Sequence, residues 1–115
     1  MDILKRIQLE KRRDTLLAEL RSVGNLMRGS LVQTKVRCGR PGCVCESGEK
    51  HLKVHLSVNL NGRTRGCYVG RAREEAVGAL LTEYQRAWKI ISDLTEVNLE
   101  LLRGEHAGGR KRGRA

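Results

Sequence analysis

Apolar residues in the first quarter of the chain recur with helical spacing. They are Leu9, Leu16, Leu20, Val23 and Met27, at successive intervals of seven, four, three and four residues. Intervals of three and four place side chains on one face of an α-helix. We therefore predict a helix over residues 2–27, within an N-terminal segment 1–27, that weakens at Gly24 and ends by Gly29.

A second apolar stripe lies closer to the C-terminus. It comprises Val77, Leu81, Tyr84, Trp88 and Ile91, and continues through Leu94 or Thr95 to Asn98 and Leu102. This stripe predicts a helix over residues 72–103, within a segment 71–103. Because the two stripes have similar lengths, we expect an antiparallel helical hairpin that resembles a coiled coil. Such a pair buries little surface alone, so we expect a homo-oligomer or a stabilising site in the connecting segment.

Between the two helices, apolar and polar residues alternate. Leu52, Val54, Leu56, Val58 and Leu60 alternate with Lys53, His55, Ser57 and Asn59. Alternation predicts a half-buried strand, and the Asn61-Gly62 pair that follows is preferred in a two-residue type I′ turn. The return strand then runs from Arg63 to Val69. The turn sets the register, which pairs Leu60 with Arg63, Val58 with Arg65, Leu56 with Cys67 and Val54 with Val69. Residues 31–37 are a candidate third strand.

Length and composition limit the class of protein. The chain has 115 residues, enough for one small domain, and no apolar run approaches the ~20 residues that a membrane-spanning helix requires. Asp2, Lys5 and Arg6 place charges where a signal peptide would have its apolar core. We therefore expect a cytoplasmic protein, whose four cysteines suit metal binding or redox chemistry better than disulfides.

Three of the cysteines are close together in a glycine-rich stretch. Cys38, Cys43 and Cys45 have the spacing C-x4-C-x-C, and His51 follows. Thiolates and imidazole are the ligands that tetrahedral Zn²⁺ prefers, so we expect a structural zinc site of the Cys₃His type. A redox dithiol is less favoured because there is no C-x-x-C motif, and an iron–sulfur cluster because the spacing differs from known ones. Loop cysteines without a metal are the remaining alternative.

Two other residues compete with His51 to be the fourth ligand. The predicted register places Cys67 with Val54 and Val69, where a free thiol acts as a small core hydrophobe. His55 is the weaker candidate, because it suits the polar face of the strand or a phosphate contact. We therefore favour His51, with Cys67 or His55 as the alternatives.

Together these elements predict an α+β fold. Two long antiparallel helices flank a small head that consists of the zinc loop and the β-hairpin. We expect a single domain over residues 1–103, with the head at residues 28–70, and a disordered, Gly- and Arg-rich tail over residues 104–115.

Positive charge is concentrated in one part of the chain. The formal net charge is +10, of which residues 28–73 carry +8, whereas residues 74–103 carry −3. A small basic domain commonly binds nucleic acid, although a solvated basic surface is the alternative. The candidate phosphate-binding residues are Arg28, Lys35, Arg37, Arg40, Lys53, Arg63, Arg65, Arg71 and Arg73, followed in the tail by Arg110, Lys111, Arg112 and Arg114.

Duplex DNA is favoured over RNA as the partner. A two-stranded ribbon fits the major groove, whereas a platform for single strands needs exposed aromatic rings. The chain has three aromatic residues, and two of them, Tyr84 and Trp88, belong to the helical stripe. A protein that binds DNA in this way would be associated with the nucleoid.

Several short motifs occur in a fixed order over residues 20–103. They are Arg28-Gly29-Ser30-Leu31, Arg37-Cys38-Gly39, Cys43-Val44-Cys45, Gly48, His51, Asn61-Gly62-Arg63-Thr64-Arg65, Tyr68-Val69 and Asn98-Leu99-Glu100-Leu101-Leu102. In these motifs the chain resembles a family of small bacterial and archaeal proteins of unknown function, often encoded near transposase-like genes. The family pattern has no cysteine at the position of Cys67, so the resemblance implies His51 as the fourth ligand. Gly70 departs from the pattern, in which a proline often follows the Tyr-Val pair.

Two kinds of function fit these features. The first is a zinc-binding protein that contacts duplex DNA through its basic head, as an accessory to a mobile element. The second is an adaptor or oligomerisation module, whose helices bind a second copy or a recombinase or transposase while the zinc is purely structural. We do not expect an enzyme, because no catalytic carboxylate pair or nucleophile–base pair stands out and a Cys₃His site leaves no open coordination position.

Overall fold

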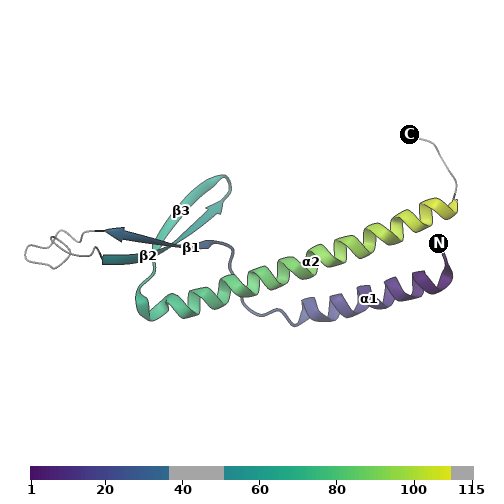
Figure 1. The fold of residues 1–115 in the computed structure, drawn as a ribbon, viewed down its shortest axis with the longest axis horizontal. Helices are drawn as coiled ribbons and strands as arrows, with labels where there is room; N and C mark the ends of the chain where they lie inside the picture. The colour runs from purple at the N-terminus through teal and green to yellow at the C-terminus, as the bar shows by residue number, and fades with distance from the viewer. Residues whose placement is uncertain (37–50, 110–115) are drawn as a thin grey trace, which may run out of the picture. The chain divides into compact units, whose positions relative to one another are not determined.

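The computed structural model describes residues 1–36 and 51–109, which form an α+β fold (Figure 1). The elements are helix α1 (Ile3–Arg21), strands β1 (Ser30–Val36), β2 (His51–Leu60) and β3 (Arg63–Tyr68), the short 3-10 helix η2 (Arg71–Arg73) and helix α2 (Glu74–Gly109). Neither helix in these two ranges combines the length and apolar character needed to cross a membrane. The predicted class is confirmed, and the candidate third strand is present as β1.

Helix α1 is shorter than predicted. The carboxylate of Asp2 accepts a hydrogen bond from the Leu4 backbone N–H (3.2 Å), which caps the first turn. The helix ends at Arg21 rather than residue 27, because Ser22 closes it with both its backbone N–H and its hydroxyl donating to the Glu19 carbonyl. The predicted stripe therefore belongs to two cores. Val23 packs against the core that contains Leu16, whereas Met27 packs against the core that contains Val54 and Leu56.

Helix α2 is longer than predicted. It begins at Glu74. Two acidic residues in its first turn interact favourably with the positive end of the helix dipole. It continues to Gly109 rather than residue 103, so residues 104–109 are helical where a disordered tail was predicted. The remainder of that tail, residues 110–115, lies outside the described residues.

The sheet has the strand order β1-β2-β3, and both pairs of neighbours are antiparallel. The β2–β3 register matches the prediction from Leu60↔Arg63 to Leu56↔Cys67, and the Val69 N–H donates to the Val54 carbonyl (3.0 Å). Asn61 and Gly62 have positive φ angles of 53° and 79°, as a type I′ turn requires at both central positions. Strict alternation and a two-residue turn were therefore sufficient to fix this hairpin.

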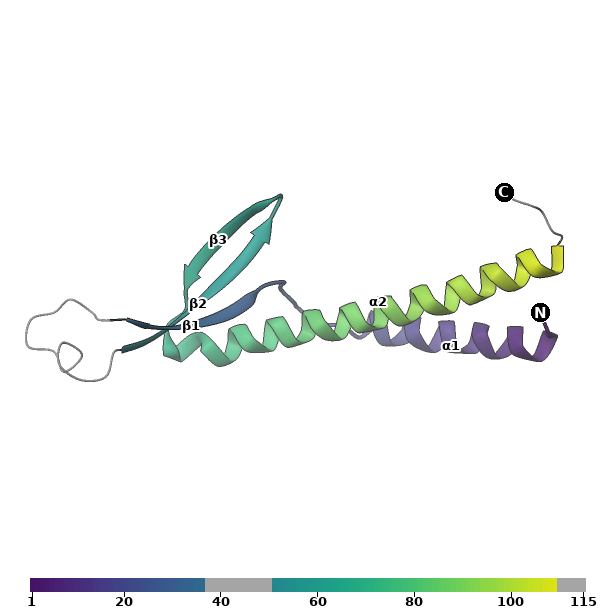
Figure 2. The same ribbon diagram turned by 45° about the horizontal axis from the view of Figure 1, so that its top comes forward.

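The chain folds as two compact units that share α2. We call Met1–Gly24 with Gln85–Ala115 the helical unit, and Asn25–Tyr84 the sheet unit. In the sheet unit, one face of the sheet packs on the first turns of α2 (Figure 2). The core there consists of Val54, Leu56, Val69 and Leu81, with Met27, Leu31, Val58 and Val77 packed around them. The Met27 N–H also donates to the Leu80 carbonyl (3.1 Å), which ties the segment before β1 to α2.

In the helical unit, α1 runs antiparallel to the second part of α2, as predicted (Figures 1 and 2). Its buried core is Leu16, Ile90 and Val97. The predicted stripe on α2 holds at Val77 and Leu81, which pack in the sheet unit, whereas the α2 residues that pack in the helical unit are Ile90, Leu94, Val97 and Leu101. Except for Leu94, these four lie one residue before the predicted positions. Trp88, expected in the stripe, is 58% exposed.

Candidate functional site

The predicted zinc ligands fall largely outside what the structure describes. Cys38, Cys43 and Cys45 lie in the segment 37–50, which is not described, together with Arg37 and Arg40. His51 is the first residue of β2 and pairs with Val36, the last residue of β1. The register therefore places Val36, two residues before Cys38 in the sequence, beside His51 at one end of the sheet.

The two competing fourth ligands occupy other places in the sheet. Cys67 pairs with Leu56, five residues from His51 and therefore about 17 Å away along β2. Its thiol is exposed rather than part of the core, which corrects the prediction, and it donates to the Tyr68 carbonyl (3.6 Å). β3 is an edge strand of the sheet. This explains why Cys67 is exposed although it is on the same face of the sheet as the core residues of β2. Within residues 1–36 and 51–109, no three His, Cys, Asp or Glu side chains are grouped to hold a metal ion.

The strands and the described segments beside them are basic and contain no acid, whereas Glu46 and Glu49 lie in residues 37–50, outside the described residues. Residues 25–36 and 51–73 hold seven cationic side chains and no Asp or Glu, so no ion pair can form within them. The seven are Arg28, Lys35, Lys53, Arg63, Arg65, Arg71 and Arg73, and all of them are exposed. The candidate cations of the tail, Arg110, Lys111, Arg112 and Arg114, lie beyond the described residues.

These cations do not form one continuous cluster. Arg63 and Arg65 follow the hairpin turn on β3, and the guanidinium of Arg28 reaches the same end of the sheet, where it donates to the Asn59 carbonyl. Lys35 lies toward the opposite end, since it pairs with Leu52, about 27 Å from Leu60 along β2. We call Arg28, Arg63 and Arg65 the hairpin-turn arginines.

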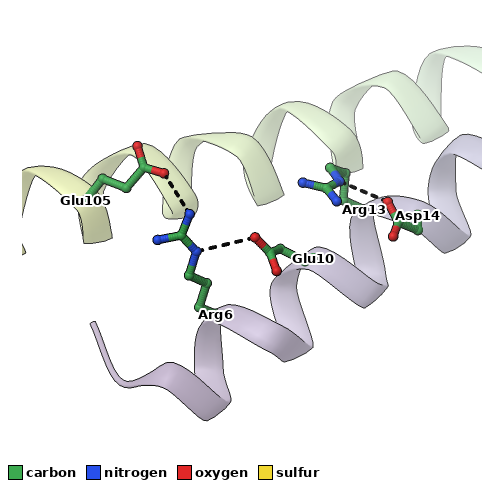
Figure 3. Close-up of polar contacts among 5 residues, drawn as sticks. All are labelled: Arg6, Glu10, Arg13, Asp14 and Glu105. Atoms are coloured by element: carbon green, nitrogen blue, oxygen red, sulfur yellow. Dashed lines mark hydrogen bonds and ion pairs between the residues drawn. The ribbon is translucent and has the colours of Figure 1, made fainter.

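The helical unit differs, because several of its cations lie beside carboxylates. Arg6 bridges Glu10 and Glu105 at 3.3 Å each, and Arg13 contacts Asp14 at 3.0 Å (Figure 3). Asp93 accepts from Lys89 at 3.0 Å and lies 3.9 Å from Arg12. Among the described residues, positive charge that is not balanced by acids of the same segment is therefore concentrated in residues 25–36 and 51–73.

Sequence reasoning missed one exposed feature of the sheet. Tyr68 pairs with His55, so both belong to the polar face of β2 rather than to the face that packs on α2. The Tyr68 side chain is 63% exposed. The signal was available, because the predicted pairing of Leu56 with Cys67 already places residue 68 opposite residue 55.

Comparison with known proteins gives a family and no function. No curated protein and no solved structure matches the chain. A family model matches residues 6–78, which include most of α1, the whole sheet and the start of α2. The chain belongs to the family described as a domain of unknown function, DUF6788.

Proposed function

We propose that this protein binds duplex DNA through the basic surface of its sheet unit, with the hairpin-turn arginines as the principal contacts. The observation that carries the proposal is the acid-free stretch, residues 25–36 and 51–73, with seven exposed cations. Exposed lysine and arginine side chains bind phosphates and release the counterions condensed on DNA.

The shape of the hairpin supports the same proposal. A two-stranded antiparallel ribbon is narrow enough to enter the major groove. Arg63 and Arg65 lie directly after the turn on the return strand, so the tip of the ribbon presents guanidinium groups. Binding of this kind is dominated by the DNA backbone, and the protein acts as a binding module rather than as an enzyme.

A structural zinc ion completes the proposal. Cys38, Cys43, Cys45 and His51 would hold it at the end of the sheet opposite the hairpin turn, and the Val36↔His51 pair supports His51 over Cys67. The chemistry of the donor set suits Zn²⁺, whose role would be to order the segment between β1 and β2. The resemblance to proteins encoded near transposases adds a context, in which the protein is an accessory to a mobile element.

The salt dependence of DNA binding tests the proposal. The full chain is titrated against a random-sequence duplex at several salt concentrations. The double variant Arg63→Ala/Arg65→Ala should lower affinity and reduce the slope of log K against log[salt] by about 2. The control Arg6→Ala/Arg12→Ala removes the same charge from cations that are paired with Glu105 and Asp93, and it should leave the slope unchanged. No binding at low salt, or equal effects of both variants, would contradict the proposal.

A second candidate function, oligomerisation, is favoured by one feature of the helical unit. Trp88, Ile91, Leu99 and Leu102 are all exposed and lie on one side of α2, beside the face that packs on α1. Their spacing is that of a helix–helix seam, so we propose that this stripe pairs with a second copy of the chain. Trp88→Glu should then reduce the mass measured by analytical ultracentrifugation, whereas Gln85→Glu, outside the stripe, should not. A monomeric wild-type protein would exclude this function.

A further inference from the structure

One row of residues crosses all three strands on the face of the sheet that points away from α2. Val32 pairs with His55, and His55 pairs with Tyr68, so the three side chains share one face. Tyr68 is 63% exposed and Val32 is 37% exposed, while His55 is half-buried between them. An aromatic ring therefore lies on the open side of a sheet, next to an imidazole.

The positions beside this row are small and polar. Two residues further along β2, Ser30, Ser57 and Gly66 form the next row on the same face. Gly66 has no side chain, and a Cβ built there would meet nothing nearer than the Leu56 carbonyl at 4.0 Å. The surface next to the Tyr68 ring therefore carries only small side chains and has room for a planar group.

The charge around the row favours an anionic ligand. Lys53 is on the same face as His55, two residues away and so about 7 Å along the strand. The three strands contain no acidic residue. A planar aromatic ligand that carries a negative charge close to its ring would match both the ring and the lysine, and a nucleotide with an unpaired base has this chemistry.

We propose that Val32, His55 and Tyr68 form a stacking platform for an unpaired base of single-stranded nucleic acid, and that Lys53 binds its phosphate. Base–aromatic stacking is tolerant of sequence, because every base has a flat face. The inference extends the proposed nucleic-acid function to single strands. It uses the opposite face of the sheet from Arg63 and Arg65, whose partners on β2 are Leu60 and Val58.

The test compares single-stranded and duplex binding by the full chain. Fluorescence anisotropy with a labelled oligothymidylate and with a random-sequence duplex measures both affinities for the wild type, Tyr68→Ala and Tyr68→Phe. Tyr68→Ala should weaken oligothymidylate binding about 5- to 150-fold, the range that removal of a stacking ring produces, and leave duplex binding unchanged. Tyr68→Phe keeps the ring and should bind both ligands like the wild type. Unchanged oligothymidylate binding by Tyr68→Ala, or an equal loss for both ligands, overturns the inference.

A second measurement does not depend on any variant. Photocrosslinking of the wild type to an oligonucleotide that contains 5-iodouracil should attach the base to the peptide with Tyr68, as located by mass spectrometry. A crosslink only to other peptides overturns the inference. If the wild type binds duplex but not oligothymidylate, the stacking platform is wrong and the duplex proposal stands. If it binds oligothymidylate through Tyr68 but not duplex, the reverse holds.

Discussion

Val36 pairs with His51 at the end of the sheet, so the chain leaves β1 and returns to β2 at neighbouring positions. This pairing leads to a specific prediction about the metal. Protein purified without added metal should contain one Zn²⁺ per chain, and Cys38→Ser and His51→Ala should each abolish it, because a tetrahedral site needs all four ligands. Elemental analysis of the purified chain measures the metal directly.

Cys67→Ser is the matched control for the zinc prediction. Cys67 is a free, exposed thiol about 17 Å along the sheet from His51, so its removal should leave the zinc content unchanged. A chelator should lower the melting temperature of the wild type and of Cys67→Ser alike, since metal binding contributes to folding. Zinc that persists in His51→Ala and is lost in Cys67→Ser would contradict the ligand set.

Gly29 lies close against β2, and its substitution should destabilise the sheet unit. Its φ is +150°, and a Cβ at this position would lie 3.0 Å from Leu56 Cδ1 and 3.1 Å from Val58 Cγ2. We expect Gly29→Ala to lower the free energy of unfolding by about 1–3 kcal/mol, from backbone strain and overpacking together. Urea denaturation followed by circular dichroism measures the loss.

Gly78→Ala provides the comparison for Gly29→Ala. Gly78 is inside α2, and a Cβ there would meet nothing within 4 Å. Alanine is the better helix former, so this variant should gain up to about 1 kcal/mol of stability. Equal losses in the two variants would show that the close approach of Gly29 to β2 does not matter for stability.

The sheet could be predicted from the sequence because its signals are local. The alternation from Leu52 to Leu60 and the turn at Asn61-Gly62 define which residues pair, and no distant contact is needed to choose among alternatives. The candidate strand at 31–37 appears as Ser30–Val36, but its register with β2 was not predicted. The β2–β3 register places Tyr68 on the exposed face of the sheet. We missed this because we considered only how many aromatic residues there are.

The ends of the helices and the face of α2 could not be predicted, because tertiary packing decides them. Val23 packs in the helical unit and Met27 in the sheet unit, so a helix that continued through both could not serve the two cores. On α2, Ile90 and Val97 are buried and Trp88 is exposed, because this part of the helix packs on α1 rather than on the sheet. The sequence identifies the basic residues that could bind phosphate. The strand register then shows that Arg63 and Arg65 lie on one face of the sheet and Lys53 on the other.

Leu16 should be the most sensitive position of the helical unit. It is 2% exposed and packs with Ile90 and Val97. Leu16→Ala should reduce the free energy of unfolding by about 2–5 kcal/mol, through lost burial and the cavity left behind. Leu4→Ala is the control, since Leu4 is 65% exposed and its truncation should change stability by less than about 0.5 kcal/mol. Similar losses in the two variants would contradict the packing of α1 on α2.

Gly62 allows backbone strain to be measured without steric contact. Its φ is +79°, and a Cβ at this position would meet nothing within 4 Å. Gly62→Ala should therefore destabilise the hairpin by about 1–2 kcal/mol through conformation alone. Gly62→Asn should lose less, because asparagine tolerates positive φ better than alanine does. Thermal denaturation of the three proteins gives the order wild type, Gly62→Asn, Gly62→Ala, and equal stability of alanine and glycine would mean that the type I′ turn is not retained in solution.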